Sequence, residues 1–334
     1  MADLRRVAAA AMASRGMAAM LDILERADRG RTERVLVLTY HRVDDAGARP
    51  HLWPGLLSAT PSDFVRHIEY LAGRMRPLSQ AELLAALAAG TAPRRSVHVT
   101  IDDAYADVAE HAWPTLRRLG VPATLFVPTG VVGDGSTFWW DRVHHALQST
   151  RFAAVPWRGR RLDLDGPIAR AKAVAHVHSE VREAQHDVAM RLVDELVHDC
   201  DPPTARREIL DWASLKALAR DGLGVGAHSK SHPRLDRVSH ATAVDEIRGS
   251  IDELRRKIDP DVPPILAYPG GDHADPAIPA AREAGVTAAF TTERGAINLP
   301  PSDPLRLRRA NVGRRGSLGA IRVQAGSWMR LAGR

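Results

Sequence analysis

Short apolar runs alternate with longer amphipathic segments along most of this 334-residue chain. The runs are rich in β-branched residues and predict strands, whereas the longer segments have helical periodicity. Strands that alternate with helices form βαβ units, and these units pair their strands in parallel. The expected strands cover residues 35–40, 96–101, 123–127, 223–227, 264–268, 287–291 and 305–312. About seven parallel strands predict an α/β fold that is a barrel or a nearly closed one.

The helical segments and the breaks in the alternation set the expected domain organisation. Residues 1–33 predict an N-terminal amphipathic helix, and residues 316–334 a C-terminal helix or tail. Residues 34–315 form the barrel. Within it an arginine-rich part and a helical part predict an insertion at about 139–211, on the rim of the active site. The expected barrel helices cover residues 61–71, 80–89, 106–119, 211–220, 242–258 and 276–284.

Composition excludes several classes of protein. The chain is 45% hydrophobic and 26% charged, which is typical of a globular protein. No run approaches the ~18 apolar residues of a membrane span. Cys200 is the single cysteine, so the fold needs no internal disulfide. The net charge of +6 is scattered and accompanies no groove-reading motif, and we therefore expect no nucleic-acid partner.

The N-terminal segment has two interpretations besides a helix packed on the domain. Arg5 and Arg6 precede an alanine-rich stretch, as in a secretory signal, but this stretch is short and Arg15 follows at once. As a basic amphipathic helix, residues 1–33 would instead lie on an anionic membrane surface. We favour a cytoplasmic location over export. A more specific hypothesis is peripheral contact with the inner face of the membrane.

Polar and turn residues follow the ends of the expected strands. His41 follows the first strand, Asp102 and Asp103 end the second, His228 follows the fourth, and Pro269 follows the fifth. In parallel α/β folds the carboxyl ends of the strands share one rim, where active sites lie. We therefore expect these residues to meet at that rim.

Two of these positions carry residue types that bind metals. His228 and His232 are four residues apart, so both can bind one ion, and an aspartate completes three protein ligands with open positions. Such a site polarises a carbonyl group and lowers the pKa of a bound water to about 7. The adjacent Asp102 and Asp103 allow one ligand and one base. Taken alone, each motif has a plainer explanation: a helix cap for Asp103, and coincidence among 15 histidines.

Two histidines and one carboxylate also bind iron in non-haem Fe(II) oxygenases. Those enzymes usually have a double-sheet β fold and a His-x-Asp spacing. Here the aspartate lies far upstream in an α/β pattern, so a hydrolytic metal site is the favoured interpretation.

The motifs resemble those of the polysaccharide deacetylases related to the nodulation chitooligosaccharide deacetylase, carbohydrate esterase family 4. The family motif Thr-Phe-Asp-Asp-Gly is matched by TIDDA at 100–104, and His-Ser/Thr-x-x-His by HSKSH at 228–232. A third motif, a proline near an aromatic residue, is matched loosely by LAYPGG at 266–271. The opening LTYHRV at 38–43 is similar to that of many bacterial members linked to exopolysaccharide or lipopolysaccharide genes.

The resemblance covers about residues 35–312 apart from the insertion, and it implies both a fold and a reaction. The implied fold is a distorted (β/α) barrel, usually of seven strands. The implied reaction is removal of N-acetyl groups from sugars by attack of water on the amide carbon. Asp102 is the implied general base, and the implied metal ligands are Asp103, His228 and His232. Zinc is the expected ion, with Co²⁺, Ni²⁺ and Fe²⁺ as alternatives for this donor set.

The chain departs from the family pattern in three places. Ala104 replaces the glycine of the first motif, and Ala267 stands where the family often has an arginine that buttresses the base. The stretch LRLRR at 305–309 lacks the histidine that often protonates the leaving amine. His41 is the expected substitute acid, since it ends a strand at the same rim and histidine is the residue type that most often transfers protons in catalysis, and His273 is the second candidate. The alternative is a catalytically impaired sugar-binding or scaffold member.

The expected substrate is an N-acetylated sugar of the cell envelope, an exopolysaccharide or a lipopolysaccharide. The backbone N–H of Gly270 is the expected oxyanion donor. Tyr268 and Pro269 of the third motif are expected to contact substrate. Trp139 and Trp140 are expected to stack on a sugar ring, with core packing as the alternative.

Arg308 and its neighbour Arg309 are candidates to bind a phosphate of a lipid-linked or nucleotide-linked sugar. A solvated strand end is the plainer interpretation of both. The sequence leaves open the oligomeric state and the choice among polymer, lipid-linked and small substrates.

Overall fold

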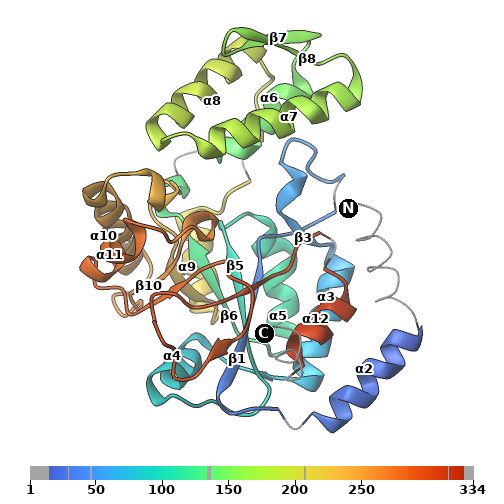
Figure 1. The fold of residues 1–334 in the computed structure, drawn as a ribbon, viewed down its shortest axis with the longest axis vertical. Helices are drawn as coiled ribbons and strands as arrows, with labels where there is room; N and C mark the ends of the chain where they lie inside the picture. Colours follow the sequence, from blue (N-terminus) through green and yellow to red (C-terminus); the bar gives the residue numbers. More distant parts are fainter. Residues whose placement is uncertain are drawn as a thin grey trace.

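A computed structural model describes residues 15–28, 30–45, 47–133, 137–206, 208–314 and 316–326. Figure 1 shows two stacked bodies: a larger one built on a curled sheet, and a smaller one formed by the middle of the chain. Parts of two predicted terminal segments, residues 1–14 and 327–334, lie outside the described residues.

The larger body contains a mostly parallel sheet in the order β11-β10-β9-β6-β5-β1. The next strand, β13, pairs in parallel with β1, and an isolated parallel bridge joins Phe290 at the end of β11 to Leu307 just before β13. The last segment therefore lies between the two edges of the sheet and curls it into a barrel. The seven parallel strands are β1 (Arg34–Tyr40), β5 (Ser96–Asp102), β6 (Ala123–Val127), β9 (Gly224–Ala227), β10 (Ile265–Ala267), β11 (Ala288–Phe290) and β13 (Ala310–Asn311). The predicted (β/α) barrel of about seven parallel strands is confirmed.

Short strands and helices complete the barrel. The strands β4 (Arg76–Pro77) and β12 (Ile297–Asn298) extend the sheet, and β2 (Arg42–Val43) pairs with β3 (Leu57–Ala59). The helices are α3 (Pro61–Arg74), α4 (Gln80–Ala89), α5 (Trp113–Arg118), α9 (Trp212–Arg220), α10 (His240–Lys257) and α11 (Ala277–Glu283).

Two predicted elements differ from those observed by more than a few residues. The helix expected over 106–119 begins with a π-helical turn, Val108–Ala112, before α5. Pro114 has no N–H to donate to residue 110, so the regular helical ladder is interrupted there. The strand expected over 305–312 pairs with β1 only at Ala310–Asn311. Before it, Leu307 bonds to the other edge: its N–H donates to the Ala289 carbonyl oxygen at 2.8 Å, and its carbonyl oxygen accepts from the Thr291 N–H at 2.9 Å.

The core lies on both faces of the sheet. Leu36, Leu38 and Tyr40 of β1 pack against the helices, and Val35 and Val37 face the barrel interior. Both faces are buried, which explains why these strands have continuous apolar runs. A Cβ at Gly226 of β9 would lie 2.7 Å from the ring of Phe126, so only glycine fits there.

The smaller body is built from elements between residues 139 and 200. It has its own hydrophobic cluster, to which Val143, Val177, Val193 and Leu196 belong. The predicted arginine-rich part forms a hairpin, and the predicted helical part forms two helices. Its elements are α6 (Trp139–Ser149), β7 (Ala154–Trp157), β8 (Arg160–Asp163), α7 (Gly166–Glu183) and α8 (His186–Cys200).

The terminal helices pack on each other. Within the predicted segment 1–33, the described helix is α2 (Arg15–Ala27), and α12 (Leu318–Ala325) lies in the predicted C-terminal segment. Arg322 of α12 donates from Nε to Glu25 of α2 at 2.7 Å. Among the described residues, no helix has the length and apolar character needed to cross a membrane.

Candidate metal centre and active-site cavity

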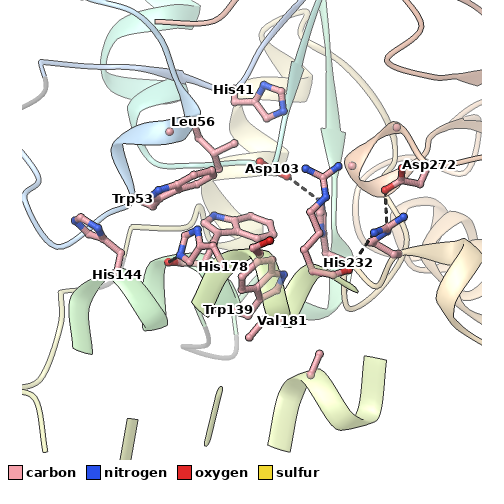
Figure 2. A pocket seen from close by; sticks show the side chains of 18 of the residues that line it. His41, Trp53, Leu56, Asp103, Trp139, His144, His178, Val181, His232 and Asp272 are labelled. Carbon is pink, nitrogen blue, oxygen red and sulfur yellow. Dashed lines mark hydrogen bonds and ion pairs between the residues drawn. The ribbon is translucent and has the colours of Figure 1, made fainter. Parts of the chain in front are cut away.

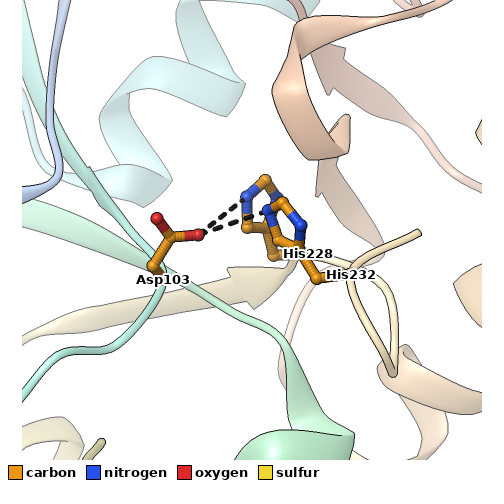
Figure 3. A group of neighbouring side chains, drawn as sticks. All are labelled: Asp103, His228 and His232. Carbon is orange, nitrogen blue, oxygen red and sulfur yellow. Dashed lines mark ion pairs between the residues drawn. The ribbon is translucent and has the colours of Figure 1, made fainter. Parts of the chain in front are cut away.

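Three potential metal ligands meet at the carboxyl ends of β5 and β9. Asp103 follows β5, His228 follows β9, and His232 lies on the loop after His228. The Asp103 Oδ1 atom lies 3.5 Å from His228 Nε2 and 3.3 Å from His232 Nε2. Figure 3 shows the carboxylate facing both imidazole rings. These ligand atoms all lie within 4.8 Å of one another, which is close enough to share one ion.

Left-handed backbone conformations turn these side chains toward one another. Asp103 has φ 76°, Ala104 φ 55°, and His232 φ 58°. Non-glycine residues rarely adopt such angles, and strain of this kind often occurs at functional sites. Ser229 Oγ accepts a hydrogen bond from the His232 N–H at 3.1 Å, which folds the loop back toward His228. The positive φ at Ala104 also explains why glycine suits this position in the deacetylase motif.

The donor set fits a divalent metal ion. Asp103 Oδ1 is buried and accepts no hydrogen bond from any described residue, so it is available to a cation. His228 Nδ1–H donates to the carbonyl oxygen of Ala267 at 2.7 Å, which leaves the Nε2 lone pair directed at the cluster. Two imidazoles and one carboxylate with room for water form a typical catalytic zinc donor set.

A buried ion pair lies beside the cluster. Asp102 accepts two hydrogen bonds from Arg309, Nη1 to Oδ1 and Nη2 to Oδ2, both at 2.9 Å. Arg309 also donates from Nε to the carbonyl oxygen of Thr291 at 3.0 Å. Burial raises the pKa of the Asp102 carboxyl, but the charge and hydrogen bonds of Arg309, together with His228 and His41, outweigh this effect, and the pKa lies below its usual value. The carboxylate is therefore held ionised and in a fixed orientation.

The sequence interpretation of Arg309 as a phosphate ligand or a solvated residue missed this contact. A signal for it exists in the strand alternation. Leu307 belongs to the hydrophobic cluster of the barrel interior, and residues two apart on an extended segment share a face. Arg309 thus faces inward, where Asp102 supplies its counter-charge.

His41 lies in the same cavity. Its Nε2 atom is 4.0 Å from Asp102 Oδ2, and its side chain is 17% exposed. Its backbone N–H donates to Ser58 Oγ at 2.9 Å, which anchors the chain directly after β1. The imidazole can therefore reach both a bound substrate and the carboxylate.

These groups share a cavity of about 940 Å³ between the barrel and the insertion. Figure 2 shows His41, Asp103 and His232 with aromatic side chains from other elements. The barrel contributes His41, Asp102, Asp103, His228, His232, Tyr268, Gly270, Asp272 and Arg309. The insertion contributes Trp139, Trp140, His144, Ala171, Ala175, His178, Ser179 and Arg182.

The structure brings most of the predicted substrate-contact residues to this cavity. Trp139, Trp140, Tyr268 and Gly270 line it, and Gly270 has φ 67°, a conformation that favours glycine. The Tyr268 hydroxyl donates to the carbonyl oxygen of Leu305, so its polar atom is already engaged. Pro269 is buried beside the cavity and is not among its lining residues.

The structure does not bring Arg308 or His273 to the cavity. Arg308 is 54% exposed, and its Nε lies 3.6 Å from Glu293 Oε2. His273 Nε2 lies 3.1 Å from Glu293 Oε1. Both side chains therefore belong to a separate polar group. Neither is placed to contact a substrate bound at Asp103, His228 and His232, which we call the metal cluster because they could hold one ion.

Sequence reasoning also missed Trp53 and His178. The two rings contact each other with centroids 4.7 Å apart, and His178 contacts Trp139 at 5.2 Å. Trp53 comes from the segment after β2 and His178 from α7, so only the tertiary fold brings them together.

A family model described as polysaccharide deacetylase matches residues 89–289, a span that includes Asp102, Asp103, His228 and His232. No curated protein matches the chain.

Several solved structures share the fold. The Streptococcus pyogenes deacetylase PplD, in complex with acetate, is 18% identical over 88% of this chain and 99% of that chain, with a TM-score of 0.60. IcaB from Ammonifex degensii is 19% identical over 89% and 99%, with a TM-score of 0.55. The BpsB deacetylase domain from Bordetella bronchiseptica is 16% identical over 85% and 97%, with a TM-score of 0.51.

Proposed function

This chain belongs to the polysaccharide deacetylase family, and from that premise we propose that it removes N-acetyl groups from a carbohydrate with the help of a bound divalent metal ion. The family makes the chain a hydrolase of carbon–nitrogen bonds, as the sequence motifs predicted, and contradicts the oxygenase alternative. The observation that carries the proposal is the placement of the buried Asp102–Arg309 pair beside Asp103, His228 and His232 in one cavity.

Asp103, His228 and His232 would hold the metal. Zinc is our first choice, and Co²⁺, Ni²⁺ and Fe²⁺ suit the same ligands. When bound, a divalent ion supplies Lewis acidity, polarising a carbonyl oxygen and lowering the pKa of water to about 7. The Ala267 carbonyl holds the His228 ring in the tautomer that this role requires.

Asp102 would take the proton of the attacking water. Its pKa below the usual value keeps it unprotonated at neutral pH, and the two hydrogen bonds from Arg309 hold its orientation. A base held in place in this way has no reorientation to make during the reaction.

Gly270 and His41 would complete the reaction. The backbone N–H of Gly270 would donate to the oxygen that becomes negatively charged when water adds to the acetamide carbon. His41 would then give a proton to the amine nitrogen as the carbon–nitrogen bond breaks, because it lies in the same cavity and 4.0 Å from Asp102.

The proposed substrate is an N-acetylated carbohydrate of the cell envelope or of an exopolysaccharide. The support is the LTYHRV opening at 38–43 and the Trp139 and Trp140 rings in the cavity, which suit the apolar face of a sugar. We place the reaction in the cytoplasm at the inner face of the membrane. The exposed Met20 and Ile23 on α2, beside Arg26, support peripheral contact with an anionic surface.

The catalytically impaired alternative rested on two missing residues, the arginine at position 267 and a late histidine. Arg309 provides the buttress for the base from another segment, which weakens the first point. His41 replaces the missing late histidine only if it protonates the leaving amine. Measurement of turnover therefore decides between the active enzyme and the impaired alternative.

The test is acetate release from N-acetylated sugars, oligosaccharides and lipid-linked sugars. Metal-stripped protein, zinc-reloaded protein and Asp102→Asn would be compared. We expect acetate only from the zinc-reloaded wild type, with metal retained by Asp102→Asn. Sugar binding without any turnover by the metal-loaded wild type would contradict the proposal and favour the impaired alternative.

A further inference from the structure

Helix α7 of the insertion forms a wall of the cavity that faces the metal cluster. Lining residues extend along it from Ala171 to Arg182, which corresponds to about 16 Å of helix. Figure 1 shows α7 on the side of the insertion that faces the barrel. The opposite side of the cavity carries Asp103 and His232, so a bound substrate would lie between barrel and insertion.

Buried polar contacts hold one flank of the insertion to the barrel. Asp141 of α6 accepts hydrogen bonds from the Trp53 N–H at 2.7 Å and from the Tyr105 hydroxyl at 2.6 Å. His144 Nε2–H donates to the carbonyl oxygen of Pro50 at 3.1 Å. Asp141 and Tyr105 are both buried, so these contacts fix this flank of the insertion to the barrel.

Arginines hold the other flank. Arg234 comes directly after the His232 loop, and its Nη1 donates to the carbonyl oxygen of Arg182 on α7 at 3.0 Å. Its Nε lies 2.9 Å from Asp272 Oδ2 on the barrel. Arg237 Nη2 lies 3.2 Å from Glu183 Oε2 at the end of α7. The C-terminal end of α7 is thus tied to the loop that carries a proposed metal ligand.

Between the two flanks, a row of rings leads away from the metal cluster. Ring centroids are 4.9 Å apart from His232 to Trp140, 5.6 Å from Trp140 to Trp139, 5.2 Å from Trp139 to His178, and 4.7 Å from His178 to Trp53. His178 Nε2–H donates to the carbonyl oxygen of Trp140, which leaves Nδ1 as an acceptor for a hydroxyl group.

The row suits a second sugar ring beside the reacting one. Aromatic faces pack on the apolar faces of sugars, and Ala171, Ala175 and Ser179 on α7 are small and exposed, which leaves space opposite the rings. The cavity of about 940 Å³ is near the upper end of the range for small-molecule sites, about 300–1,000 Å³, so it has room for more than one sugar ring.

We propose that this cavity accepts short N-acetylated glycans, or the end of a glycan, and excludes the interior of a long polymer. The inference rests on the proposed deacetylase function. A residue inside a polymer carries chain on both sides, and both chains must leave the cavity, whereas the insertion is tied to the barrel at both flanks. A chain end needs only one exit.

The test uses N-acetylglucosamine and its β-1,4-linked oligomers of two to six units, together with a long soluble polymer of the same linkage. Acetate release is measured with zinc-loaded full-length protein, and mass spectrometry locates the deacetylated unit. We expect kcat/KM per acetyl group to be at least about tenfold higher for the oligomers than for the polymer. We also expect the acetyl groups to be lost from the terminal sugar units. Equal loss throughout the polymer would overturn the inference and leave the deacetylase function intact. Release of acetate neither from these probes nor from the other N-acetylated and lipid-linked sugars of the activity test would contradict the proposed function itself.

A matched pair of variants on α7 tests the cavity directly. Ala175 and Lys172 are both exposed, and of the two only Ala175 is among the described residues that line the cavity. We expect Ala175→Trp to lower kcat/KM on oligomers about tenfold while sparing the monosaccharide, because the new ring fills the space for the second sugar. Lys172→Trp should change neither. An equal response of both substrates to Ala175→Trp would overturn the placement of the second ring.

Discussion

Replacing Arg309 with methionine should destabilise this protein and lower its activity for one reason: it leaves a buried carboxylate without its counter-charge. Asp102 and Arg309 are 2% and 1% exposed, and two hydrogen bonds of 2.9 Å join them. Breaking a buried pair by removing one partner typically costs about 3–5 kcal/mol. We therefore expect Arg309→Met to lower the free energy of unfolding by about this amount, and kcat/KM for acetate release by about a hundredfold, since Asp102, the proposed base, loses its orientation.

The matched control is Arg308→Met, one residue earlier. Arg308 is 54% exposed and lies 3.6 Å from its nearest carboxylate oxygen, so its removal should cost less than about 1 kcal/mol and leave turnover unchanged. Urea unfolding and acetate release measure both variants. If the two variants are equally stable, the ion pair does not make the contribution that its burial implies.

A double-mutant cycle separates the lost charge from the lost packing. Asp102→Asn removes the carboxylate charge, so combining it with Arg309→Met should recover about 2 kcal/mol relative to Arg309→Met alone. Acetate release should stay low in the double variant because the carboxylate of Asp102, the proposed base, is absent. Additive destabilisation by the two substitutions would refute the claim that an unpaired charge causes the loss.

Three further predictions concern separate parts of the molecule. Asp103→Asn should lower bound zinc measured by mass spectrometry at least about tenfold, while Asp45→Asn, an exposed aspartate, should not. Burial lowers the pKa of His98 to about 4, below its value of about 6.5 in an unfolded chain, so its contribution to stability is complete above pH 6.5 and is lost as the pH falls toward 4. Urea unfolding should show that the free energy of unfolding falls by up to about 3 kcal/mol over this pH window, and His98→Gln should remove this dependence on pH. The same pH dependence in His98→Gln as in the wild type would contradict the assignment to His98. Burial raises the pKa of the Cys200 thiol to about 12, so it should react slowly with a thiol reagent at pH 8 and quickly once urea opens the insertion; rapid native reaction would show that this core is loosely packed.

The parts of the fold that could be predicted from sequence are those with a local signal. The strand at 123–127 and the helix at 80–89 match β6 and α4 because an apolar run and a capping box mark their limits. The position of Asp103, His228 and His232 at the carboxyl ends of the strands could also be predicted, since each comes directly after a strand or shortly beyond one.

The remaining features depend on contacts between distant segments. The segment before β13 has apolar alternation, but only its position between β11 and β1 turns Arg309 toward Asp102. Likewise, Trp53 and His178 lie far apart in sequence and meet only when the insertion packs on the barrel. The alternation places Arg309 on the inward face but does not identify its partner. No periodicity or spacing records the contact of Trp53 with His178, so these pairings could not be assigned in advance.

The Asp102–Arg309 contact joins residues 207 positions apart, and this separation has a consequence for biosynthesis. A nascent chain emerges from the ribosome with all three proposed metal ligands long before Arg309 is translated. Until the last segment inserts between the sheet edges, the carboxylate of Asp102 has no counter-charge. On this proposal catalytic competence arrives with the final strand, and truncated products that retain every proposed metal ligand should still lack an oriented carboxylate at Asp102.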